Sequence, residues 1–164
     1  MLVFLDTEFT DALNCDLISI AMVSECGRRE FYAERSDFER GWCSAFVQAA
    51  VLPHLGRFPT ALATRSSLQR RLLDWFEALD EPVVLAYDST MDWELLVDAL
   101  DGEMPARVQG TFDLKLVQAL PAFGPAMTRA HDRDRPWHHA WFDALAQREG
   151  WLALQAAGEA PVLG

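Results

Sequence analysis

Apolar residues in the first part of the chain fall in short runs that are typical of strands. Leu2–Leu5 is an apolar run too short for a helix, and it ends at Asp6. Leu17–Val23 is a second apolar run rich in β-branched residues, and Gly27 marks a turn before a third predicted strand at Glu30–Ala33. The three segments predict an antiparallel meander at the start of the fold.

The next part of the chain changes to helical spacing. Asp37 to Leu52 has the pattern of a helix, and Pro53 is expected to end it. Four apolar side chains of this segment are expected to share one buried face: Phe38, Trp42, Phe46 and Val47. A second helix is predicted from Ser66 to Leu79, with Thr64 or Ser66 as its cap.

The second half alternates strand and helix patterns. In order, it predicts a strand at Pro82–Tyr87, a helix at Met91–Leu100, a strand at Val108–Phe112, a short helix at Leu114–Leu120, an irregular loop at Pro121–Pro136 and a final helix from His139 to Ala156. This order indicates an α/β fold, with a mixed central sheet flanked by helices. Of the 164 residues, 1–157 are expected to form a single domain and 158–164 a short C-terminal tail.

Four carboxylates stand at the ends of these predicted elements. Asp6 and Glu8 follow the first strand, and residues two apart in a strand point to the same side. Asp92 opens a helix after the strand at Pro82–Tyr87, and Asp143 lies among apolar residues at the start of the last helix. Mg²⁺ prefers oxygen ligands of this kind. Each acid also has an ordinary interpretation, as a solvated strand end or as an acid favoured by a helix dipole.

The charge and the cysteine content argue against several classes of protein. The net charge of −11 argues against a protein that binds long duplexes through a basic face. Cys15, Cys26 and Cys43 form no CxxC pair, so neither a zinc site nor a disulfide framework is indicated. No basic segment precedes the first acid and no apolar run approaches transmembrane length, so we expect a cytoplasmic protein without a signal peptide or membrane span.

Three motifs, taken together, are similar to those of a known family. They are FLDTEF at Phe4–Phe9, AYDSTMDWELL at Ala86–Leu96 and HHAWFDALA at His138–Ala146. Their order and spacing resemble the DEDDh branch of the DnaQ-like 3′→5′ exonucleases, a family with an RNase H-like fold. The chain departs from the family at Asp88, where an asparagine is usual.

The resemblance implies a two-metal phosphodiesterase. Its metal ligands would be Asp6, Glu8, Asp92 and Asp143, binding two Mg²⁺ ions, with Mn²⁺ as a substitute. The His-x4-Asp spacing selects His138 rather than His139 as the general base.

Four residues are expected to contact the substrate: Thr7, Glu8, Phe9 and Arg65. By the resemblance, Glu8 and the backbone of Thr7 would lie near the terminal 3′-OH. Phe9 is a candidate to stack on the terminal base, although a core phenylalanine is the ordinary interpretation. Arg65, at the start of a predicted helix, is a candidate phosphate contact.

A closer resemblance concerns substrate and assembly. The stretches Asp6–Glu34 and Val51–Leu55 look like those of the small bacterial exoribonucleases related to RNase AS. This implies a single-stranded RNA 3′ end as substrate, a preference for adenylate tracts and a homodimer. Two alternatives stay open, a DNA exonuclease of the proofreading type and an inactive RNase H-like binding module. The complete set of four acids and a histidine argues against the inactive module.

Overall fold

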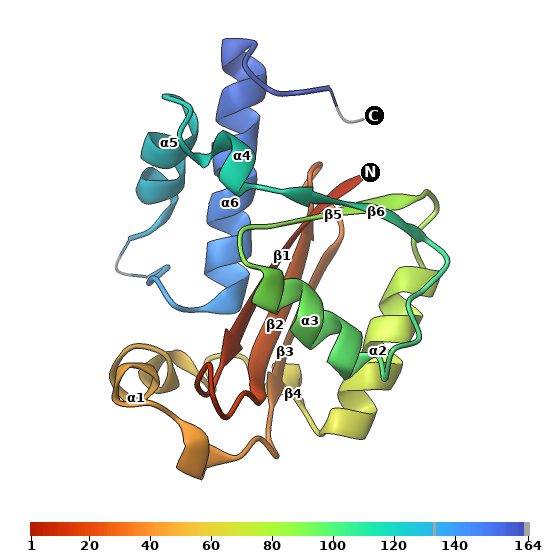
Figure 1. Ribbon diagram of the computed structural model, residues 1–164, viewed down its shortest axis with the longest axis vertical. Coiled ribbons are helices and arrows are strands. Elements are labelled where there is room, and N and C mark those ends of the chain that lie inside the picture. Colours follow the sequence, from red (N-terminus) through yellow and green to blue (C-terminus); the bar gives the residue numbers. More distant parts are fainter. Residues whose placement is uncertain (133, 163–164) are drawn as a thin grey trace.

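The computed structural model describes residues 1–132 and 134–162, and its centre is a mixed six-stranded sheet (Figure 1). The strands are β1 (Leu2–Phe9), β2 (Leu17–Ser24), β3 (Glu30–Arg35), β4 (Leu62–Ala63), β5 (Val83–Tyr87) and β6 (Val108–Asp113). Their order across the sheet is β4-β3-β2-β1-β5-β6. The pairs β1–β2 and β2–β3 are antiparallel and the other pairs are parallel. The predicted α/β fold with an N-terminal antiparallel meander is therefore confirmed.

Helices cover both faces of this sheet (Figure 1). The α-helices are α1 (Ala45–Ala50), α2 (Arg65–Glu77), α3 (Thr90–Ala99), α4 (Lys115–Gln118), α5 (Phe123–Ala130) and α6 (Ala140–Ala157). Three short 3₁₀ turns accompany them: Arg40–Trp42, Leu52–His54 and Pro59–Ala61. One core cluster joins the sheet to α2 and α3, and a second joins the opposite face to α5 and α6.

Side chains along β1 alternate between the two faces of the sheet, and this determines the face on which each residue packs. Val3 and Leu5 pack in the cluster that contains α2 and α3. Leu2 and Phe4 pack in the cluster that contains Trp151 of α6. Because successive strand residues point to opposite faces, Asp6 continues the row of Leu2 and Phe4 and is directed toward α6. β1 extends to Phe9, so the first two acids lie within the strand and not beyond its end.

The helix predicted from Asp37 to Leu52 is wrong as a continuous element. The segment forms two 3₁₀ turns around the short helix α1, whose N-cap Ser44 accepts a hydrogen bond from the backbone of Val47. Trp42 and Phe46 are 47% and 57% exposed, so they do not share the buried face of Val47. Residues that favour capping interrupt the helix here, and the apolar spacing alone does not reveal this.

The irregular loop predicted at Pro121–Pro136 is also wrong, because α5 occupies much of it. Pro125 stands in the first turn of α5, where a missing amide costs no helical hydrogen bond. The helix packs closely on α6, and a Cβ added at Gly150 would lie 2.9 Å from the Phe123 ring. α6 ends at Ala157 and is capped by Gly158, which has a φ of 71° and starts the expected tail; residues 163–164 of that tail lie outside the described residues.

Candidate metal centre

Five carboxylates from four segments of the chain come together where β1 lies beside β5 in the sheet and α6 packs on β1. Two sets of ligand oxygens each lie within 4.8 Å of one another: Asp6, Glu8 and Asp143 form one set, and Asp6, Asp88 and Asp92 form the other. Asp6 belongs to both. We call these five residues the acidic centre. Carboxylate oxygens are the ligands that Mg²⁺ takes, so each set can hold a metal ion.

Asp92 is fixed by hydrogen bonds from β1 and from the start of its own helix. The Thr7 hydroxyl and backbone amide donate to Asp92 Oδ1 at 2.6 and 3.1 Å. The Ser89 backbone amide donates to the other oxygen at 3.3 Å, which completes a capping box at the start of α3. Asp92 is buried beside β1, with an exposed fraction of 3%, and these bonds fix the orientation of its carboxylate.

Asp143 and Gln147 lie one turn apart on α6 and face the same strand. Asp143 Oδ2 accepts a hydrogen bond from the His139 backbone amide at 3.0 Å. The Gln147 side-chain amide donates to Asp6 Oδ1 at 3.1 Å. Asp143 Oδ1 and Gln147 Oε1 are both buried and have no hydrogen-bond partner among the described residues. Unsatisfied buried oxygens are rare, and ligation of a cation would account for the one on Asp143, from which His131 Nε2 lies 3.3 Å away without forming a hydrogen bond.

Mutual repulsion and burial both disfavour ionisation of the acidic centre. Burial, followed by the charges of Asp143, Asp92 and Glu8, raises the pKa of Asp6 well above its ordinary value. Burial raises the pKa of Glu8 to about 8 and those of Asp92 and Asp143 to about 7. A bound divalent cation reverses the local charge and favours the ionised forms. The charge balance of the site therefore fits a metal.

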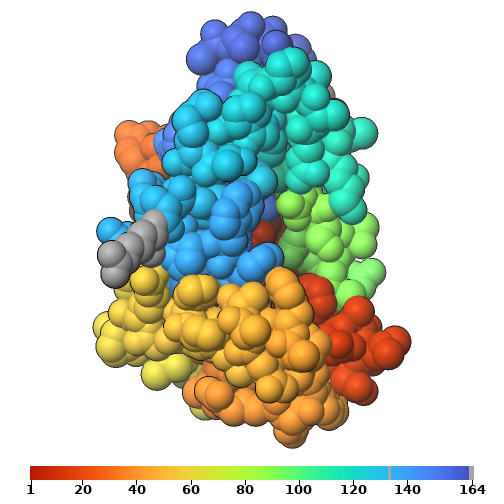
Figure 2. Space-filling view, turned by 90° about the vertical axis from the view of Figure 1, so that its left-hand side faces the viewer, coloured from red at the N-terminus to blue at the C-terminus, as the bar shows by residue number. Residues whose placement is uncertain are grey.

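The acidic centre lines a cavity of about 270 Å³ that opens at the surface. In Figure 2 a hollow is visible there, with red atoms of the N-terminal segment and blue atoms of α6 at its floor. The lining residues are Asp6, Thr7, Glu8, Phe9, Asp88, Ser89, Asp92, Met127, His131, Trp137, His138, Asp143 and Gln147. None of these described lining residues is a lysine or an arginine, so no permanently charged side chain in the lining neutralises the five acids.

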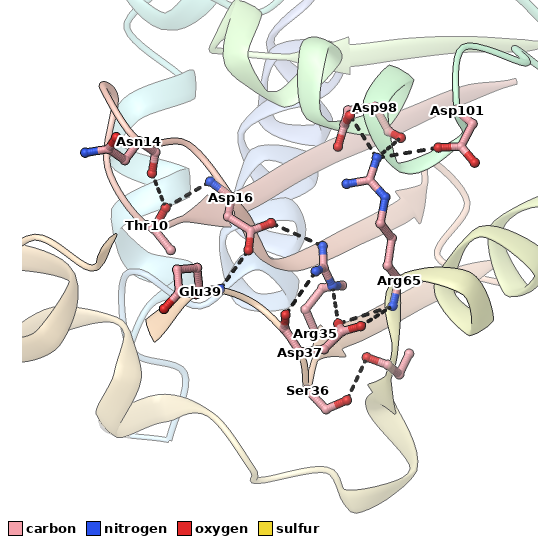
Figure 3. A network of polar contacts seen from close by, with 11 residues as sticks. Thr10, Asn14, Asp16, Arg35, Ser36, Asp37, Glu39, Arg65, Asp98 and Asp101 are labelled. Carbon is pink, nitrogen blue, oxygen red and sulfur yellow. Dashed lines mark hydrogen bonds and ion pairs between the residues drawn. The ribbon is translucent and has the colours of Figure 1, made fainter. Parts of the chain in front are cut away.

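Arg65 is the predicted site residue that the structure does not bring to the cavity. It starts α2, where its guanidinium donates to Asp98 at 2.9 Å and lies 3.5 Å from Asp101 (Figure 3). Its backbone amide donates to Asp37, which also accepts from Arg35 at 2.6 Å. Arg65 thus takes part in a separate network of ion pairs and is not positioned as a phosphate contact of this cavity. Thr7, Glu8 and Phe9 do line the cavity.

The two adjacent histidines occupy different environments. His138 is exposed, lines the cavity and has a φ of 61°, a left-handed conformation that a non-glycine residue seldom adopts. His139 is only 2% exposed and its ring stacks on Tyr32 at 4.8 Å between centroids. Burial lowers the pKa of His139 to about 4. His138 is therefore the one of the pair whose side chain lines the cavity.

Sequence reasoning missed four lining residues that bear on the chemistry. Asp88 was singled out only as a departure from the asparagine usual in the resembled family, yet it completes the second carboxylate set and accepts a hydrogen bond from Gln118 at 3.1 Å. Gln147 follows Asp143 by one helical turn, a spacing that could have indicated it. His131 and Trp137 lie after α5, His131 within the segment expected to be irregular and Trp137 just beyond it, so no pattern pointed to them.

No family model matches the chain, and the search of curated proteins finds no match. The mixed sheet with three antiparallel N-terminal strands, together with the acidic centre, is compatible with an RNase H-like fold. Within the described residues, no helix is long and apolar enough to cross a membrane.

Proposed function

We propose that this chain is a metal-dependent 3′→5′ exoribonuclease that releases 5′-nucleoside monophosphates from single-stranded RNA. The observation that carries the proposal is the sharing of Asp6 between two carboxylate sets. A carboxylate that belongs to two ligand sets could serve two cations, and a two-cation site would suit phosphodiester hydrolysis, in which both the attacking and the leaving oxygen need stabilisation. The motif resemblance adds the direction of attack and the nature of the product.

The residues of the acidic centre would hold two Mg²⁺ ions, with Mn²⁺ as a substitute. When bound, such ions polarise the scissile phosphate and ease ionisation of the attacking water. Asp6 would contribute to both ions, while Gln147 orients its carboxylate through the 3.1 Å hydrogen bond. Thr7 fixes Asp92 on the side of α3. Preorganised ligands of this kind reduce the rearrangement needed when metal and substrate bind.

His138 is the proposed general base. Its imidazole lies on the cavity wall, where it can take the proton of the attacking water, the usual task of a general-base histidine. The left-handed backbone supports this role, because such strain is found where a side chain must be presented in one direction. His131 also lines the cavity, 3.3 Å from Asp143, and is the rival imidazole for this step.

The acidic character of the site favours a substrate held at its end. With no lysine or arginine in the described lining, the cavity offers no track for a long phosphate backbone. Single-stranded RNA and DNA of one sequence, incubated with Mg²⁺, test this proposal directly. Release of 5′-mononucleotides from RNA is expected to be faster, and fastest from adenylate tracts. Preference for DNA would favour a proofreading-type exonuclease, and binding without cleavage would favour an inactive module.

Assembly is a second proposal, and it rests on the resemblance to small bacterial exoribonucleases. We expect a homodimer. Three large apolar side chains near the β1–β2 connection and α1 are exposed and are available to an interface: Leu13 at 92%, Trp42 at 47% and Phe46 at 57%. Light scattering at micromolar concentration should report twice the mass of 18.5 kDa. A monomer in that measurement would remove the dimer and leave the catalytic proposal intact.

A further inference from the structure

We propose that the exposed face of the Trp137 indole is the surface on which the terminal nucleobase of the substrate stacks. The inference deepens the proposed function and rests on it. Trp137 lines the cavity and is 42% exposed. It stacks on His131 with 3.6 Å between ring centroids and 21° between planes. A tryptophan left this open beside a polar cavity has apolar surface to offer a ligand.

His131 connects this indole to the acidic centre. Its side chain is only 3% exposed, and its Nε2 lies 3.3 Å from Asp143 Oδ1. Its other ring nitrogen lies 3.2 Å from the carbonyl oxygen of Arg135. The imidazole is thus hydrogen-bonded at one edge and lies beside Asp143 at the other, and its face carries the indole. Trp137 is separated from a proposed metal ligand by one aromatic ring, so a base stacked on it would belong to the nucleotide whose phosphate is near the acidic centre.

The charge of the cavity explains why stacking would matter. Without a lysine or arginine among the described lining residues, the protein itself has little attraction for phosphate. Beyond what bound metal ions contribute through the phosphate, affinity for a nucleotide then has to come from contacts of the protein with the sugar and the base. Stacking of a base on an aromatic side chain typically changes affinity by about 5- to 150-fold. Purines have the larger ring surface and should gain more from this contact than pyrimidines.

Phe9 is less suited to the same task. It lines the cavity, but it is only partly exposed and packs against the core cluster that joins the sheet to α2 and α3. Trp137 belongs to none of the core clusters found among the described residues. Its free face can therefore be covered by a base without disturbing the packing of the fold.

Binding of a product nucleotide tests the inference without turnover. The affinities for 5′-AMP and for ribose 5-phosphate, which lacks the base, are measured by calorimetry with Mg²⁺ present. The wild-type protein should bind 5′-AMP at least about 5-fold more tightly, and Trp137→Leu should lose that difference. Trp137→Phe keeps an aromatic face and should retain most of it. Leu116→Ala removes an exposed apolar side chain outside this cavity and outside the proposed interface, and it should change nothing.

Two results would overturn the inference. One is a wild-type protein that does not prefer 5′-AMP over ribose 5-phosphate. The other is a Trp137→Leu variant, folded by circular dichroism, in which the preference survives. If Trp137→Leu does not fold, the comparison of Trp137→Phe with Trp137→Ser decides in the same way. Absence of RNA hydrolysis would contradict the proposed function and would leave the stacking inference untouched. The ratios of the binding affinities test only whether Trp137 is the stacking surface.

Discussion

Asp6→Asn should abolish nucleotide release, because this single carboxylate belongs to both ligand sets. Asparagine keeps the shape of the side chain and can still pair with Gln147, but it brings no negative charge to either cation. Loss of residues that only orient a metal ligand typically costs about 10- to 100-fold. Loss of a ligand shared by both sets should therefore exceed about 100-fold, measured as the initial rate of mononucleotide release.

The same substitution should stabilise the metal-free protein. Burial and neighbouring charges raise the pKa values of Asp6 and Glu8 in the folded state, that of Glu8 to about 8. The folded state thus binds more protons than the unfolded chain between about pH 4 and pH 8, so its free energy of unfolding falls as the pH rises through that window. Removing one charge from the cluster reduces the repulsion among the remaining carboxylates, so the free energy of unfolding should fall less as the pH rises.

The measurement is the melting temperature in EDTA at pH 5 and pH 8. Wild-type protein should melt at a lower temperature at pH 8, and Asp6→Asn should raise that value by at least about 3 °C, since about 1 kcal/mol shifts the melting temperature of a chain this size by roughly 2–4 °C. Glu103→Gln removes an exposed acid and is the matched control, with no expected change. A variant that melts below the wild type at pH 8 would show that the acidic centre is not repulsive without metal.

His138→Ala should lower kcat by roughly 10²- to 10⁴-fold, the usual range for loss of a general base. Its ring is exposed at the cavity wall and meets Phe46 edge to face at 4.9 Å between centroids, so few packing contacts are lost. Metal affinity should change little, because His138 is not a proposed ligand. Rates at saturating RNA and Mn²⁺ binding by calorimetry separate the two effects.

Two neighbouring histidines serve as controls for this assignment. His139→Ala should stay within a few-fold of the wild type per folded molecule, although it should melt at a lower temperature because the ring stacks on Tyr32 and packs on Phe142. His131→Ala tests the rival imidazole. A severe loss of kcat in His131→Ala together with full activity in His138→Ala would transfer the general base to His131. Equal losses in His138→Ala and His139→Ala would indicate a structural role for the pair.

Elements with a strong periodic pattern were predictable from the sequence. The strands β1, β2 and β5 are apolar runs, and α2 and α6 follow helical spacing over several turns. The segments that failed carry competing signals. Ser44 caps a new helix inside the interval expected to be continuous, and Pro125 is tolerated in α5 because it lies in the first turn. Neither effect is visible in the apolar pattern.

The residues of the acidic centre could be predicted only in part from the sequence, for a similar reason. Asp6 and Glu8 could be paired because strand residues two apart share a face. Asp88 could not be distinguished from a turn cap, since that depends on how β5 lies beside β1 in the sheet. The approach of Trp137 and His131 to Asp143 depends on the path of the chain after α5, which no local pattern encodes. The positions of these residues in the site are set by long-range packing, which the local spacing of residues in the sequence does not reveal.

Metal-dependent release of mononucleotides from a labelled single-stranded RNA is the measurement that tests the central claim most directly. With Mg²⁺ or Mn²⁺, the wild-type protein should shorten the RNA from its 3′ end and release 5′-monophosphates. EDTA should stop the reaction, added Mg²⁺ should restore it, and Zn²⁺ should serve poorly because the ligands are carboxylates and not thiolates. Full activity in EDTA, or equal activity in Asp6→Asn, would contradict a two-metal nuclease centre built on Asp6.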